Sequence, residues 1–132
     1  MKPTVIIVDD DPESAEILSD LLELRSIKVL GVGYDGKDAV GLYKKYSPDV
    51  VIMDLFMPNF DGLYGLENIL KLNSNAKVIM LTANSKYESA DRLNDSGVSA
   101  IVEKPFDTNN LIHLIDKISL GDAIQLGDSV KQ

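Results

Sequence analysis

The segment Val50-Val51-Ile52-Met53-Asp54 constrains the fold of this chain more than any other. Four apolar residues, three of them β-branched, stop abruptly at a carboxylate, and a continuous apolar run is typical of a parallel strand buried on both faces. Pro58 and the pair Asp61-Gly62 then predict a loop, because both are strong turn signals. An acid that ends a buried strand lies at the rim of its sheet, so Asp54 is a candidate functional residue.

Similar apolar runs recur along the chain, and segments with helical spacing separate them. In the first such segment Asp11 can cap a helix and Pro12 suits its first position, and Ala15, Leu18, Leu21 and Leu22 repeat at helical spacing. The other runs cover residues 5–8, 28–32, 78–81 and 100–102, and further helices are predicted at about 36–47, 63–70, 85–97 and 108–118. This alternation predicts an α/β fold, a doubly wound, five-stranded parallel sheet with helices on both faces and right-handed crossovers.

Length and composition limit the classes of protein to consider. The 132 residues suit one domain, which we place at residues 1–119, and residues 120–132 lack periodicity and are expected to form a tail or linker stub. A formal net charge of −8 without a Lys/Arg cluster disfavours direct binding to nucleic acid or anionic membranes. The chain has no cysteine, no signal-peptide pattern and no apolar run of roughly 18 residues, so we expect a cytoplasmic protein without a membrane span.

Polar residues follow four of the five predicted strands. Asp9 and Asp10 follow the first strand, Asp54 the third, Thr82 the fourth and, after Glu103, Lys104 the fifth. Ligands of open α/β sheets bind outside the carboxyl ends of the strands, so these side chains are expected to converge. Carboxylates held close together favour a cation among them, and an all-oxygen site with few carboxylates suits Mg²⁺.

The chemistry of this set matches phosphoryl transfer. A carboxylate can attack phosphorus, a lysine can neutralise charge, and a hydroxyl can donate to a phosphoryl oxygen. Taken singly, Asp11 is explained as well by a helix cap, Thr82 by an ordinary strand end and Lys104 by a surface position. The prediction therefore depends on the joint pattern at the ends of four strands.

These residues also carry a resemblance over about residues 4–119. Asp9-Asp10 after the first strand, Met53-Asp54 with Met57-Pro58 and Asp61-Gly62, Leu81-Thr82-Ala83, and Lys104-Pro105-Phe106 resemble the motifs of a response-regulator receiver domain of two-component signalling. In size the chain is similar to single-domain chemotaxis regulators. The resemblance implies a flavodoxin-like sheet of strand order 2-1-3-4-5.

The resemblance assigns roles to these residues. Asp54 would be the phosphoacceptor, modified to 4-aspartylphosphate. Asp9, Asp10, Asp54 and the backbone carbonyl of Phe56 would hold Mg²⁺, with Mn²⁺ as a possible substitute. Lys104, in a cis bond to Pro105, would pair with Asp54 and then with the phosphoryl group, and Thr82 would move toward it. The donor would be a histidine kinase or a phosphotransfer protein, and the domain would catalyse only its own phosphorylation and dephosphorylation.

Three positions modify the expected behaviour. Ile101 lies where many relatives carry an aromatic ring that turns inward with the threonine, and isoleucine cannot reproduce that rotation. Phe56 and Asn84 occupy positions that tune access of the hydrolytic water in the family, and a bulky Phe56 predicts a shielded phosphoryl group and slow self-dephosphorylation. His113, the only histidine, is expected on a helix surface.

The resemblance further implies a switch. Phosphorylation would draw in the loop that begins at Ala83 and reshape the face formed by the fourth helix, fifth strand and fifth helix. That face would bind an output protein or domain, or a second copy in a phosphorylation-dependent homodimer.

Two other functions remain open from the sequence. A small phosphatase of the haloacid-dehalogenase type would use Asp9 as nucleophile in the pattern Asp9-x-Asp11, although Glu13 departs from its motif and its late acidic pair is missing. A receiver fold that serves only for binding and no longer cycles phosphate is the second, and the intact set of acids, hydroxyl and lysine disfavours it.

Overall fold

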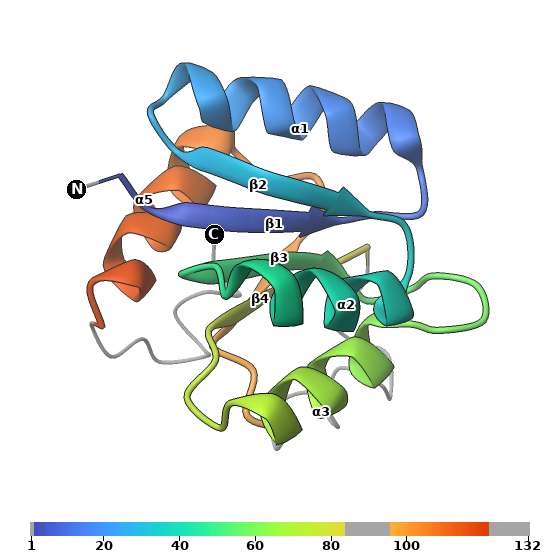
Figure 1. The fold of residues 1–132 in the computed structure, drawn as a ribbon. Helices are drawn as coiled ribbons and strands as arrows, with labels where there is room; N and C mark the ends of the chain where they lie inside the picture. The colour runs from blue at the N-terminus through green and yellow to red at the C-terminus, as the bar shows by residue number, and fades with distance from the viewer. Residues whose placement is uncertain (1, 84–95, 122–132) are drawn as a thin grey trace.

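The computed structural model describes residues 2–83 and 96–121, which form a parallel sheet covered by helices (Figure 1). The strands of the sheet are β1 (Thr4–Val8), β2 (Lys28–Gly33), β3 (Val50–Asp54), β4 (Val78–Thr82) and β5 (Ala100–Glu103). The helices within these residues are α1 (Pro12–Leu24), α2 (Gly36–Tyr46), α3 (Gly62–Leu72) and α5 (Thr108–Ser119). The predicted fourth helix, at about 85–97, falls almost entirely outside the described residues, as does the C-terminal segment from residue 122.

The five strands lie in the order β2-β1-β3-β4-β5 and all neighbouring pairs are parallel, which confirms the predicted fold. β1 pairs with both β2 and β3, so the chain reverses its direction of winding at that point. In Figure 1, α1 and α5 cover one face of the sheet, and α2 and α3 cover the other. A reversal of this kind opens a crevice at the carboxyl ends of the strands, where ligands of such folds bind.

The hydrophobic core consists of two layers, one on each face of the sheet. Alternate residues of a strand point to opposite faces, so Ile52 packs with residues of α1 and α5 whereas its neighbour Met53 packs with residues of α2 and α3. Both side chains are fully buried. The continuous apolar runs in the sequence are therefore explained by burial on both faces.

Aspartate begins every helix in the described residues. Asp11, Asp35, Asp61 and Asp107 each occupy the N-cap and accept a hydrogen bond from a backbone N–H of the first turn. Such caps satisfy N–H groups that lack a partner within the helix. Asp11 with Pro12 at the start of α1 was predicted from the sequence and is confirmed.

No helix in residues 2–83 and 96–121 is long and apolar enough to cross a membrane.

Ile52 provides a test of the two-sided core. Ile52→Ala should lower the free energy of unfolding by about 2–5 kcal/mol, because it removes a fully buried side chain from the central part of the sheet. Leu24→Ala is the control, since Leu24 is 79% exposed at the end of α1. Urea unfolding measures both variants, and equal losses of stability would contradict the burial of Ile52 in the core.

Candidate functional site

The predicted polar residues meet at the carboxyl edge of the sheet. Carboxylate oxygens of Asp9, Asp10 and Asp54 lie within 4.8 Å of one another, although they come from the turn after β1 and the end of β3. Thr82, the last residue of β4, is buried, and Lys104 follows directly after β5. The parallel register thus brings Asp9, Asp10, Asp54 and Lys104 into contact distance and places Thr82 at the same edge of the sheet.

Lys104 makes the closest contact to Asp54. Its Nζ lies 2.8 Å from Oδ1 and 3.0 Å from Oδ2 of Asp54, and it donates a hydrogen bond to Oδ2. The same Nζ lies 3.9 Å from Oδ2 of Asp9. The short contact to Oδ1 is an ion-pair contact without hydrogen-bond geometry, so this buried oxygen accepts no hydrogen bond from the described residues. The ammonium of Lys104 therefore lies against both oxygens of Asp54 and bonds only one of them.

The electrostatics of Asp54 differ from those of an exposed acid. Burial raises its pKa from the ordinary 3.8 to about 7, because the charged form loses its hydration. The hydrogen bond and positive charge of Lys104 act in the opposite direction, and Asp9 raises the pKa further. One ammonium does not compensate for burial and a neighbouring acid, so the site is short of positive charge.

A divalent cation fits this site by the chemistry of its donors. Three carboxylates supply oxygen ligands, the ligand type that Mg²⁺ prefers, and one oxygen of each lies within 4.8 Å of the others. Asp9 is held in place because its Oδ1 accepts a hydrogen bond of 2.9 Å from the N–H of Asp11. Asp10 is exposed and is the most accessible of the three.

Asp11, for which a cap and a site role were both open, serves as the cap of α1. It accepts hydrogen bonds from the N–H of Glu13 and the hydroxyl of Ser14, and the Ser14 bond is the main reason its pKa is lowered. Its carboxylate does not belong to the acidic cluster.

The remaining predicted residues lie around the site. Phe56 is 47% exposed in the loop between β3 and α3. Ile101 is buried in β5 opposite Met80 and packs in the core layer beneath α2 and α3. His113 is exposed on α5, as predicted, and the Lys104–Pro105 peptide bond is cis, also as predicted. Asn84 lies outside the described residues.

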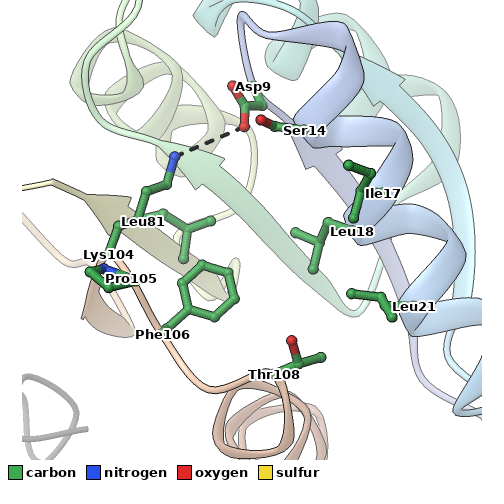
Figure 2. Close-up of a pocket in the computed structure, with 10 residues that line it drawn as sticks. All are labelled: Asp9, Ser14, Ile17, Leu18, Leu21, Leu81, Lys104, Pro105, Phe106 and Thr108. Carbon is green, nitrogen blue, oxygen red and sulfur yellow. Dashed lines mark ion pairs between the residues drawn. The ribbon is translucent and has the colours of Figure 1, made fainter.

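A groove of about 520 Å³ begins at the ion pair of Asp9 and Lys104 and runs between α1 and the start of α5 (Figure 2). Its walls are largely apolar, with Ile17 and Leu21 on one side and Phe106 on the other. Leu21 was predicted to belong to the apolar stripe of α1, but Leu21 is 39% exposed and Ile17 56% exposed. The spacing of four between Ile17 and Leu21 was the available signal that they share a separate face of α1.

Comparison with known proteins agrees with this geometry. Residues 5–116 match the family model described as response regulator receiver domain. The chemotaxis protein CheY of Thermotoga maritima is 30% identical over 119 residues, which cover 90% of this chain and 99% of that protein. CheY of Bacillus subtilis is 30% identical over 117 residues, which cover 89% of this chain and 98% of the relative.

Two solved structures show the same architecture. A two-component response regulator of the LuxR family from Aurantimonas sp. SI85-9A1 has a TM-score of 0.85 and 28% identity, with 97% of this chain and 92% of that chain covered. The CheX–CheY–BeF₃–Mg²⁺ complex from Borrelia burgdorferi has a TM-score of 0.80 and 28% identity, with 87% of each chain covered.

The raised pKa of Asp54 predicts a specific pH dependence of stability. The folded domain holds this proton up to a pKa of about 7, whereas the ordinary value is 3.8. The corresponding stabilisation is fully present below the lower value and is lost as the pH rises through the higher one. In metal-free protein, the loss of unfolding free energy from about pH 5 to about pH 8 should therefore be smaller for Asp54→Asn than for wild type. Urea unfolding with EDTA measures it, and identical pH slopes would contradict the burial effect.

Proposed function

The chain belongs to the response regulator receiver family, and on that basis we propose that it accepts a phosphoryl group on Asp54 and passes the signal to a partner protein. One observation carries the proposal: the carboxylate of Asp54 is buried beside Asp9 and Asp10, with Nζ of Lys104 2.8 Å away. A nucleophile, two further acids and a counter-charge therefore lie at one point of the sheet edge. Positioning and neutralisation of charge account for most of the catalysis in phosphoryl transfer.

In the proposed reaction an oxygen of Asp54 attacks the phosphorus of a phosphohistidine. An O–P bond forms while the P–N bond breaks, and the imidazole leaves with the electron pair and takes up a proton. Lys104 holds the carboxylate in place before the transfer and pairs with phosphoryl oxygens after it. Thr82, buried at the end of β4, is the hydroxyl assigned to a phosphoryl oxygen.

Asp9, Asp10 and Asp54, with the backbone carbonyl of Phe56, are the proposed ligands of Mg²⁺, for which Mn²⁺ could substitute. When bound, the metal supplies the positive charge that three carboxylates and a phosphoryl group require. The protein's own contribution is to hold the acids together at the sheet edge. Burial is the main cause of the raised pKa of Asp54 and Asp9 adds to it, so a cation bound here would stabilise the charged carboxylate.

The proposed donor is a histidine kinase or a phosphotransfer protein. The groove beside the Asp9–Lys104 ion pair supports a protein donor, because its exposed apolar walls include Ile17 and Leu21. Adjacent exposed apolar side chains of this kind are typical of surfaces that other proteins cover. The output partner would bind the face that includes β5 and α5.

The proposed switch differs from the common aromatic one. Ile101 is buried in the core layer on the α2 and α3 face, so its response to a movement of Thr82 would be repacking within the core. Two packings of the same domain, with different affinities for a partner, would suffice for signalling. A second copy of the domain is one candidate partner.

The site of modification is tested by treating the domain with acetyl phosphate or beryllofluoride in Mg²⁺ and mapping the labelled residue. We expect label on Asp54 and none in Asp54→Asn, whereas Asp20→Asn, a change of an exposed acid on α1, should label like wild type. Label on Asp9 would support the dehalogenase-type mechanism instead. Unchanged partner binding by Asp54→Asn, with no label in wild type, would support a domain that only binds.

Phe56 is predicted to slow hydrolysis of the aspartyl phosphate by limiting the access of water. Phe56→Asn should lose its phosphoryl group faster than wild type, by about tenfold, because asparagine is smaller and can orient a water molecule. Leu72→Asn is the matched control, since Leu72 is 46% exposed and Phe56 is 47% exposed. Decay of labelled protein measures the rate, and equal or faster decay in wild type would defeat the prediction.

A further inference from the structure

Two glycines outside the predicted site, Gly36 and Gly62, contact the two ends of the loop that carries Phe56. Gly36 begins α2 and Gly62 begins α3, and both are buried. We propose that these two glycines are positioning residues, which fix the loop of residues 55–61 so that the Phe56 carbonyl faces the acidic cluster. This inference rests on the proposed Mg²⁺ site and extends it to residues that contact no ligand.

The loop is held at both ends by backbone hydrogen bonds from these glycines. The N–H of Gly62 donates to the carbonyl of Leu55 at 2.9 Å, and the N–H of Gly36 donates to the carbonyl of Phe60 at 2.6 Å. Phe56 lies between these two anchors. A carbonyl that serves as a metal ligand must be oriented by its own backbone, because it has no side-chain torsion with which to adjust.

No other residue fits at position 62. A Cβ atom there would overlap the carbonyl oxygen of Asp54 and would lie 2.9 Å from the Cα of Leu55. These are backbone atoms, and they have little freedom to retreat: Asp54 pairs with Leu81 in the sheet, and the N–H of Leu55 donates to the Leu81 carbonyl at 2.8 Å. A methyl group at position 62 would therefore displace the proposed phosphoacceptor, the start of the loop or α3.

Position 36 excludes a side chain at the other end of the loop. A Cβ atom there would overlap the carbonyl oxygen of Asp61 and would lie 3.1 Å from that of Phe60. It would also lie 3.0 Å from the N–H nitrogen of Gly65. Since all three are backbone atoms, alanine at position 36 would push the loop away. The hydrogen bond from the N–H of residue 36 to the carbonyl of Phe60 would then lengthen.

Of two further glycines nearby, only Gly41 provides a matched control. A Cβ atom at Gly41, within α2, would have nothing within 4 Å beyond its own helix backbone, so Gly41→Ala meets no steric resistance. Gly65, within α3, is unsuitable as a control, because a Cβ atom there would lie 3.3 Å from the Cα of Gly36 as well as 2.8 Å from the sulfur of Met53. Gly65→Ala would therefore disturb the Gly36 anchor from the α3 side, and Gly41→Ala serves as the control.

The experiment measures Mg²⁺ affinity by calorimetry and amide hydrogen exchange in metal-free protein. Gly36→Ala and Gly62→Ala should bind Mg²⁺ about tenfold or more weakly, as found for groups that orient metal ligands, whereas Gly41→Ala should bind like wild type. The amide of residue 62 should also exchange faster in Gly36→Ala, because the loop links the two anchors.

Four outcomes are informative. If Gly36→Ala folds and binds Mg²⁺ as tightly as Gly41→Ala, the inference is overturned. Should Gly62→Ala fail to fold, Gly36→Ala still decides, because its methyl group contacts the far end of the loop. If wild type binds no Mg²⁺, the proposed function fails instead, and unchanged exchange at residue 62 in Gly36→Ala would separately refute the link between the anchors.

Discussion

The carboxylate of Asp54 is buried at the end of a central strand, next to another acid, and much of this structure is arranged around that unfavourable position. Burial and Asp9 raise its pKa to about 7, and the ion pair with Lys104 only partly offsets them. The free energy of a buried carboxylate of this kind changes strongly when a charge is added nearby, whether a cation or a phosphoryl group. The feature that makes the site costly for the folded domain is also what suits it to act as a switch.

The parallel sheet makes this arrangement possible. The strands β1, β3 and β4 are buried on both faces by helices, so their interiors carry only apolar side chains and polar groups are confined to the strand ends. Because every strand runs in the same direction, the carboxyl ends of β1, β3, β4 and β5 lie along one edge. Short segments far apart in the sequence thereby contribute to one site.

The site also depends on close packing of backbone against backbone. The loop after β3 is enclosed by the starts of α2 and α3, and the contacts at Gly36 and Gly62 leave no room for a side chain. The neighbouring groove between α1 and α5 is open and apolar by contrast. One side of the acidic cluster is thus closely packed by the protein itself, and another side offers exposed apolar side chains next to the Asp9–Lys104 ion pair.

The sequence by itself determined the strands, the helix cap at Asp11, and the membership of Asp9, Asp54 and Lys104 in one site, because apolar periodicity and strand-end position are local properties of the chain. It did not reveal that Leu21 is partly exposed, because the part of the α1 surface that is buried depends on where α5 lies. The raised pKa of Asp54 and the contacts of Gly36 and Gly62 were decided only by the tertiary structure. Desolvation and steric exclusion depend on atoms that are distant in sequence, and these become neighbours only when the chain has folded.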